Sequence, residues 1–446
     1  MKEIKLSEHF TYKKLIRFTL PSVFMMMFMS VYGIVDGLFV SNLAGEVAFK
    51  AINIVMPFIM IVTTVGFMLG SGGTAIVANA RGAGDIKRAN SCFSLFVYTT
   101  VIASSLVAIA SLIFIRQIAA LLGAEGEILE AAVQYARIIL IAVPAASLQF
   151  FFQSFFVAAE KPKLGLFVII LAGVMNMVLD ALLVTLLPLE YKLIGAAVAT
   201  AASQTVGGLV PVIYFASKNS TPFRLGKTEF KPRAIMQACY NGSSEFMSNI
   251  SMNLVGILYN LQLLKYAGDD GVAAYGVMMY VGMIFAAVFI GYSIGVAPVI
   301  SFHDGAENSE EKRSLLRKSL IIITVISVAM LVAGELLSEP LSALFVGYNA
   351  QLMALTVSGM RIFSFCFLFM GIAIFGSSFF TALGDGLTSA VISFLRTLVF
   401  QLAAVLTLPV LLGGVDGIWL SVVLADLLAT LLTVVFIIAK KKKFKY

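Results

Sequence analysis

The sequence is poor in charged residues, in histidine and in cysteine. Asp, Glu, Lys and Arg make up 12% of its 446 residues, against about a quarter in a typical soluble domain. It has two His, His9 in a polar leader and His303 in an expected loop, which argues against histidine-based metal or triad chemistry. The three Cys show no CxxC spacing, so we expect no disulfide framework and no zinc site.

Hydrophobic residues, by contrast, make up 60% of the chain. They form long continuous runs and not the alternating pattern of a membrane β-barrel. A helix needs about 20 apolar residues to cross a bilayer, and no signal-peptide cleavage site follows the polar leader. The composition therefore predicts a polytopic helical membrane protein that keeps its first helix.

The apolar runs fall into two sets of six, separated by a polar stretch. We predict an N-lobe at 1–217, a linker at 218–233 and a C-lobe at 234–446. The predicted spans are 15–40, 51–78, 92–115, 131–158, 163–187, 193–216, 234–265, 271–301, 316–336, 351–382, 386–412 and 416–439.

The positive residues lie mostly on one side of these spans. We count 24 of the 31 Lys and Arg in the leader, the even-numbered connections, the linker and the tail, and four on the opposite side. Because positive residues near helix ends stay in the cytoplasm, we predict a cell-membrane protein with both termini cytoplasmic. The net charge of +7 is then a topology signal with attraction to anionic membrane lipid, and no nucleic-acid partner is expected.

The two halves of the chain resemble each other. An offset of 223 residues places Gly72–Asp85 over Gly295–Asn308, and an offset of 224 places 137–138 over 361–362, both Arg-Ile. Because each repeat has an even number of spans, the pseudo-two-fold axis that relates them runs along the membrane normal. The predicted fold class is an all-α polytopic membrane protein with twelve transmembrane helices in two six-helix lobes and a cleft between them.

Four acidic residues lie well inside apolar runs, namely Asp36, Asp180, Glu245 and Asp426. An ionisable group inside a span is costly and is a candidate functional residue. Asn176 and Asp180 are four positions apart, which places them on one helical face. If that face meets Asp36, the group can share a proton or supply oxygen ligands to a monovalent cation. The alternative is a structural polar network between helices.

The surroundings of these acids differ. The offset of 224 pairs Asp36 with Asn260, so the architecture alone does not demand a charge at that position. Glu245 lies in NGSSEFMSNISMN, whose small and polar residues suit a cleft better than lipid, and its contact with a ligand is left open. Asp426 has few polar neighbours, and we expect it to pair with Arg396 or a helix end in a structural role.

Several segments together resemble the multidrug and toxic compound extrusion (MATE) family of antiporters, over essentially the whole chain. The resemblance implies two lobes of six helices, efflux of amphipathic organic cations, and coupling to inward movement of protons or sodium ions. Some members carry an acid in the tenth helix, which is absent here, so no second-lobe sodium site is expected. The segments are Pro21 followed by VDGLFVSNLAG, then GTAIVANARGAGDIKRA, NMVLDALLV, GAAVATAASQ and GVAPVISFHDGAEN.

The resemblance also assigns site residues. Asp36, Asn176 and Asp180 match the family's ion-coupling positions, and Thr200 looks like a further oxygen ligand, so these four would hold Na+ if sodium is the coupling ion. Glu245 matches the acidic position of the seventh helix and is a candidate substrate-binding residue.

Two further predictions concern substrate binding and motion. Met27 and Asn260 complete the candidate substrate-binding set, because soft Met side chains suit promiscuous binding, although ordinary packing is an equal alternative for Met27. Pro21 removes one backbone hydrogen bond from the first helix and is the predicted conformational hinge.

No enzyme activity is expected. The G-x-S-x-G match at 291–295 lies inside a span, and the Gly-Lys-Thr at 226–228 lacks the leading Gly of a phosphate loop. The expected partners are small-molecule cationic drugs or dyes and membrane lipid, with a monomer as the oligomeric state and no cofactor besides H+ or Na+. A lipid-linked oligosaccharide flippase of the same superfamily is the alternative function, and a structural scaffold is the non-transport one.

Overall fold

The computed structural model describes residues 4–39 and 45–446, and over these residues the chain is helical without any β-strand. The first bundle, which we call the N-lobe, follows the six predicted spans closely. Its helices are α1 (Tyr12–Phe39), α2 (Glu46–Gly82), α3 (Ile86–Leu121), α4 (Gly126–Ala158), α5 (Pro162–Leu186) and α6 (Leu189–Ala216).

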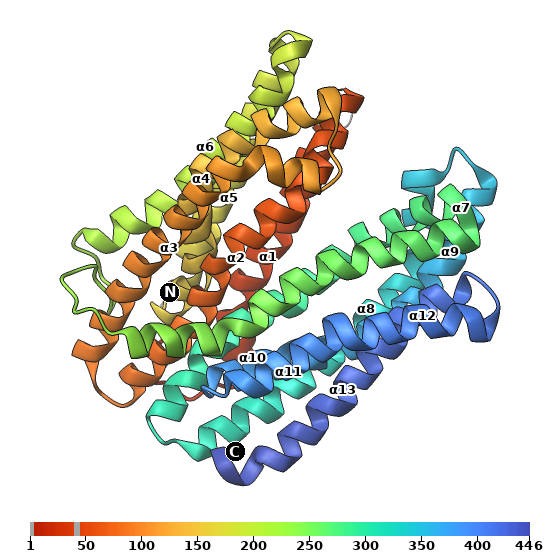
Figure 1. Cartoon of the computed structure of the whole chain (residues 1–446). Helices are drawn as coiled ribbons and strands as arrows, with labels where there is room; N and C mark the ends of the chain where they lie inside the picture. Colours follow the sequence, from red (N-terminus) through yellow and green to blue (C-terminus); the bar gives the residue numbers. More distant parts are fainter. Residues whose placement is uncertain (1–3, 40–44) are drawn as a thin grey trace.

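The second bundle, the C-lobe, begins with a helix that is far too long for one span. Helix α7 (Pro232–Gly305) has 74 residues, about 110 Å if straight, against a hydrocarbon core of about 30 Å. Gly268 interrupts it with φ 63° and ψ −156°, a backbone conformation open to glycine. The chain reverses there (Figure 1), so α7 supplies the seventh and eighth spans. His303 lies in the last turn of α7 and is buried, so the expectation of a loop there was wrong.

The remaining C-lobe helices include two irregular spans. Helices α9 (Ala350–Ser364) and α10 (Cys366–Ala382) form one span bent by 45°. A π-helical turn, Leu395–Val399, joins α11 (Gly386–Phe394) to α12 (Phe400–Leu412) within another. With α8 (Ser309–Val346) and α13 (Asp416–Phe444), and with α7 counted as two, the described residues form twelve apolar crossings, as predicted.

The duplicated segment is a helix–turn–helix that occurs once in each lobe. Asp85 accepts a hydrogen bond from the Arg88 backbone N–H at 2.9 Å and caps α3. Asn308, 223 positions later, accepts one from the Glu311 N–H at 3.0 Å and caps α8. Capping by a side-chain oxygen satisfies a free N–H at the helix start. The two copies of the repeat therefore share this capping interaction as well as a similar sequence.

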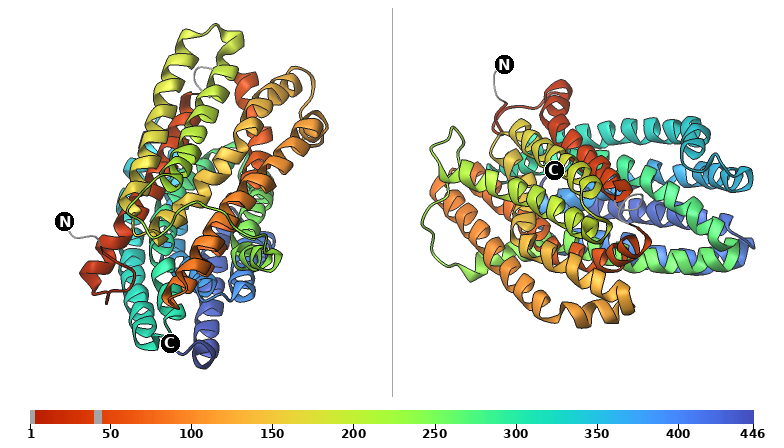
Figure 2. Two further views of the ribbon diagram at one scale, coloured as in Figure 1. Left: turned by 90° about the vertical axis from the view of Figure 1, so that its left-hand side faces the viewer. Right: turned by 90° about the horizontal axis from the view of Figure 1, so that it is seen from above.

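The two bundles lie side by side, meet at one end and diverge toward the other (Figures 1 and 2). We call the end where they meet the linker end, because the linker 217–231 and the α2–α3 turn lie there. Glycines permit the contact: a Cβ on Gly82 would lie 1.9 Å from the Phe302 carbonyl oxygen, and one on Gly305 would lie 1.9 Å from the Asn79 carbonyl oxygen. Both pairs are related by the 223-residue offset, so the interface itself has the predicted pseudo-two-fold symmetry.

Candidate functional site

Four N-lobe side chains converge between α1, α5 and α6. Asp36 comes from the last turns of α1, and its Oδ1 lies 3.5 Å from the Thr200 hydroxyl of α6. Asn176 and Asp180, one turn apart in α5, are 1% and 0% exposed. Asp36 is close enough to both of them for side-chain interaction. The structure therefore brings together the four residues that the sequence singled out as ion-coupling candidates.

This cluster lacks partners for several of its polar atoms. Neither carboxylate oxygen of Asp180 and neither polar atom of Asn176 has a hydrogen-bond partner within 4–39 and 45–446. Buried polar groups in native proteins are almost always satisfied, and a buried carboxylate without a cation is strongly disfavoured. The geometry thus leaves places for a proton or for one small cation between Asp36 and Asp180.

Two tyrosines that the sequence did not single out border the cluster. Tyr135 of α4 is 1% exposed and lies close to Thr200 and Asp36. Tyr32, one turn before Asp36 in α1, lies close to Gln149 of α4. No motif marks these two positions among the 14 Tyr of the chain.

Glu245 lies apart from this cluster, at the junction of the lobes. It lines a cavity of about 30 Å³, roughly the volume of one water molecule. Hydroxyl groups from both lobes form most of the polar wall, and an acid among hydroxyls offers several oxygen ligands to a cation. These hydroxyl residues are Ser71, Thr74 and Ser154 of the N-lobe and Ser301, Ser378 and Thr381 of the C-lobe.

The other two candidate substrate residues do not line this cavity. Met27 packs against the apolar core of the C-lobe. Asn260 is exposed and lies four turns beyond Glu245 in α7, about 22 Å along the axis. Helix α1 passes through Pro21 without a break. A shared substrate site for these residues and a hinge at Pro21 therefore stay predictions.

The C-lobe holds a buried ion pair in its interior. Arg396 Nε donates to Asp426 Oδ1 at 2.9 Å, and Asp426 is 1% exposed. Arg396 belongs to the π-helical turn, an irregularity that changes the direction of a side chain within a span. The expected pairing of Asp426 with Arg396 is thus observed.

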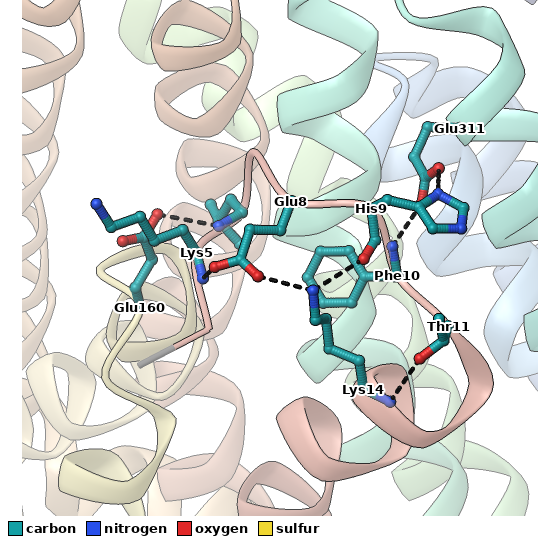
Figure 3. A network of polar contacts seen from close by, with 9 residues as sticks. Lys5, Glu8, His9, Phe10, Thr11, Lys14, Glu160 and Glu311 are labelled. Carbon is teal, nitrogen blue, oxygen red and sulfur yellow. Dashed lines mark hydrogen bonds and ion pairs between the residues drawn. The ribbon is translucent and has the colours of Figure 1, made fainter. Parts of the chain in front are cut away.

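The N-terminal segment, residues 4–11, crosses the linker end and contacts both lobes (Figure 3). The Leu6 N–H donates to Glu160 Oε1 at 3.0 Å, beside the α4–α5 turn of the N-lobe. The Phe10 N–H donates to Glu311 Oε1 of α8 at 2.9 Å, and His9 pairs with the other oxygen of Glu311. Leu6 and Phe10 are 0% exposed, so the segment is packed as well as hydrogen-bonded.

No cluster of three or more His, Cys, Asp or Glu suited to a metal ion occurs in the described ranges. Two pseudo-symmetric six-span lobes, with titratable groups inside both lobes and at the lobe junction, define the architecture of a two-lobe membrane transporter.

Comparison with known proteins identifies the family. The MatE family model matches residues 21–182 and 246–406, and the chain belongs to this family of transporters. It is 25% identical over 437 residues to the multidrug export protein MepA of Staphylococcus haemolyticus, covering 97% of this chain and 94% of that one. It is also 25% identical over 422 residues to MepA of Staphylococcus aureus strain MRSA252, covering 94% and 92%.

Solved structures show the same fold. A MATE crystal structure described as the straight conformation superimposes with a TM-score of 0.92 at 21% identity, covering 100% of both chains. A MATE family transporter described as outward-facing gives 0.90 at 22% identity, again covering 100% of both. The bent conformation gives 0.87 at 22% identity, covering 98% and 97%. The predicted two-lobe helical fold is therefore confirmed.

Proposed function

We propose that the chain is a secondary active multidrug efflux transporter that exchanges amphipathic organic cations for H+ or Na+ by alternating access. The observation that carries this proposal is the cluster of Asp36, Asn176, Asp180 and Thr200, in which the buried polar atoms of Asn176 and Asp180 lack partners within the described residues. The names of the relatives, multidrug export proteins, support the class of cargo.

The cluster links ion binding to helix packing. Two ionised carboxylates about 5 Å apart repel each other by about 3 kcal/mol at an effective dielectric constant of about 20. A proton or Na+ bound between Asp36 and Asp180 removes this repulsion and lets α1 and α5 approach. A free-energy change of this size shifts a two-state equilibrium by about two orders of magnitude. Ion binding can thereby select the lobe arrangement, with Pro21 as the proposed place where α1 bends.

The lobe junction favours a cationic cargo. Glu245 and the hydroxyls around it form an acidic and hydroxyl-lined wall, which suits a cationic group, and in our proposal a rearrangement of the lobes widens this water-sized space to admit the cargo. A lipid-linked oligosaccharide flippase would need to hold a pyrophosphate, and no basic residue lines this cavity. In our proposal the linker end faces the cytoplasm, because the positive residues gather there.

Asp36→Asn tests the proposal in everted membrane vesicles to which a fluorescent cationic dye is added from outside, so that transport appears as uptake into the lumen. We expect dye transport by the wild type under a proton or a sodium gradient, imposed separately, and its loss in the variant with the protein still folded. Asp269→Asn, an acid-to-amide change at an exposed position, is the matched control and should transport normally. Undiminished transport by Asp36→Asn would remove the cluster from the mechanism.

A further inference from the structure

A second and larger cavity, of about 500 Å³, opens at the linker end. Arg88 of α3 contributes to one wall, and the last linker residues and first turn of α7 form the other, with Lys231, Arg233 and Gln237. The cavity therefore lies between the N-lobe and the first helix of the C-lobe. It shares no residue with the cavity beside Glu245.

The wall carries more positive charge than the protein neutralises. Neither the Arg88 nor the Arg233 guanidinium forms an ion pair within the described ranges. Lys231 Nζ lies 3.6 Å from Glu229 Oε2, but the Glu229 side chain is 86% exposed. The Asp85 carboxylate accepts a hydrogen bond from the Arg88 backbone N–H at the start of α3, and it forms no ion pair with either guanidinium within the described ranges. Three cations that face one cavity repel each other, and an anion between them relieves that repulsion.

The cavity is held in shape by the linker. The Ser91 and Thr228 hydroxyls are 3.0 Å apart, and the Gly226 N–H donates to Ser94 Oγ at 3.1 Å, so the linker follows α3. Further back, the Phe223 ring stacks on Phe93 with centroids 5.3 Å apart. These contacts fix the backbone just before Lys231, so less ordering is needed when a ligand binds.

Large apolar side chains flank the basic residues. Phe230, next to Lys231, is 78% exposed, Met236 of α7 is 71% exposed, and Ile86, at the start of α3, is 60% exposed. In a membrane protein such side chains at a helix end enter the boundary between head groups and acyl chains. Cations beside exposed apolar groups at this depth match the two parts of a phospholipid.

We propose that this cavity binds the phosphate of an anionic membrane phospholipid from the leaflet on the linker side. Arg88 and Arg233 hold the phosphate oxygens through planar guanidinium groups, which suit phosphate geometry, and Lys231 adds a third charge. Phe230 and Met236 cover the upper acyl chains. The lipid touches both lobes, and the proposal stands independently of the transport function proposed above.

Native mass spectrometry of the detergent-purified full chain, titrated with dioleoyl-phosphatidylglycerol, tests the site. The cavity variant combines Arg88→Gln, Lys231→Gln and Arg233→Gln. We expect the wild type to retain one bound phosphatidylglycerol under conditions in which it loses dioleoyl-phosphatidylcholine. We expect the cavity variant to bind phosphatidylglycerol at least ten-fold more weakly than the wild type does. Binding equal to wild type would overturn the proposal.

The matched control removes the same charge from the same side of the protein. Lys163→Gln, Lys227→Gln and Lys441→Gln together change exposed cations outside the cavity. We expect this control to bind phosphatidylglycerol within two-fold of wild type. If it loses as much affinity as the cavity variant, the attraction is a general property of the basic surface and the site is refuted.

A competition experiment separates a lipid from a free phosphate. Millimolar inorganic phosphate or glycerol phosphate should not displace the bound phosphatidylglycerol, because neither has acyl chains to cover Phe230. Displacement by either would overturn the lipid assignment. Should the triple variant fail to fold, Arg233→Gln is compared with Lys227→Gln. A loss of three-fold or more in the first alone is expected, and equal binding contradicts the proposal.

Discussion

Gly82 and Gly305 determine how closely the lobes approach at the linker end. A Cβ at either position would lie 1.9 Å from a carbonyl oxygen of the other lobe, whereas ordinary contacts begin near 3.4 Å. Gly82→Ala with Gly305→Ala therefore forces the backbones apart by about 1.5 Å. Overpacking of this kind costs about 1–3 kcal/mol, and the whole cost falls on the arrangement in which this end is closed. We expect the ratio of closed to open molecules to fall by about 5- to 150-fold.

Distances between spin labels measure this shift. Labels at Lys163→Cys on α5 and Arg313→Cys on α8 report the separation of the lobes at the linker end, and both native residues are exposed. The three native Cys are replaced first. We expect the glycine variants to gain a population at longer distance, with the same helical content as wild type. Dye efflux should also slow, because the closed state is part of the cycle.

The control replaces a helical glycine whose surroundings have room for a Cβ. Gly256 is helical, lies in α7 and has nothing within 4 Å of a built Cβ. Gly256→Ala should leave the distance distribution unchanged. If the variants at Gly82 and Gly305 behave like this control, the lobes do not separate along this interface, and the reasoning from close approach is refuted.

Three further predictions concern charged side chains. Glu311→Gln weakens charge-assisted hydrogen bonds worth about 1.5–3 kcal/mol each. Trypsin should therefore cut the N-terminal segment at least ten-fold faster. An unchanged rate would contradict the role of this segment as a contact between the lobes. Asp426→Leu leaves Arg396 buried without a partner and should cost about 3–5 kcal/mol. The double variant with Arg396→Met should recover most of the lost thermal stability, and a failure to recover would mean that more than the ion pair was damaged. Glu245→Gln should weaken the binding of a cationic dye about ten-fold in fluorescence polarisation, and equal affinity would place the cargo elsewhere.

The number and order of spans followed from the sequence, because a bilayer imposes a length and an apolar composition on every crossing. The irregularities did not. The bend between α9 and α10 falls at Phe365, whose φ of −62° and ψ of −23° are helical, and no Pro or Gly marks it. The π-helical turn at Leu395–Val399 likewise has no Pro or Gly that would have predicted it. Such features depend on packing against neighbouring helices, which local sequence does not encode.

The candidate site was likewise only partly predictable from the sequence. Spacing within one helix placed Asn176 and Asp180 on one face, and their isolation in an apolar run marked them. Contacts between residues far apart in the chain have no signal in the local sequence. The Leu6 backbone N–H donates to Glu160, 154 positions away, and the Phe10 N–H donates to Glu311, 301 positions away. In the sequence both are isolated apolar residues in a polar leader.

The buried aspartates of the two lobes differ in whether a described cation pairs with them, and this difference is relevant to the mechanism. In the C-lobe, Asp426 has Arg396 at 2.9 Å as a counter-ion within the protein, so its charge is balanced in this structure without a bound ion. In the N-lobe, no described cation pairs with Asp180, and we propose that a proton or a small cation that binds and dissociates balances its charge. In our proposal a carboxylate paired with an arginine does not respond to an ion gradient, whereas a carboxylate without a fixed cation does. The duplicated architecture thus supplies two equivalent bundles, and in our proposal the N-lobe, where no described cation pairs with Asp180, is the one that responds to H+ or Na+.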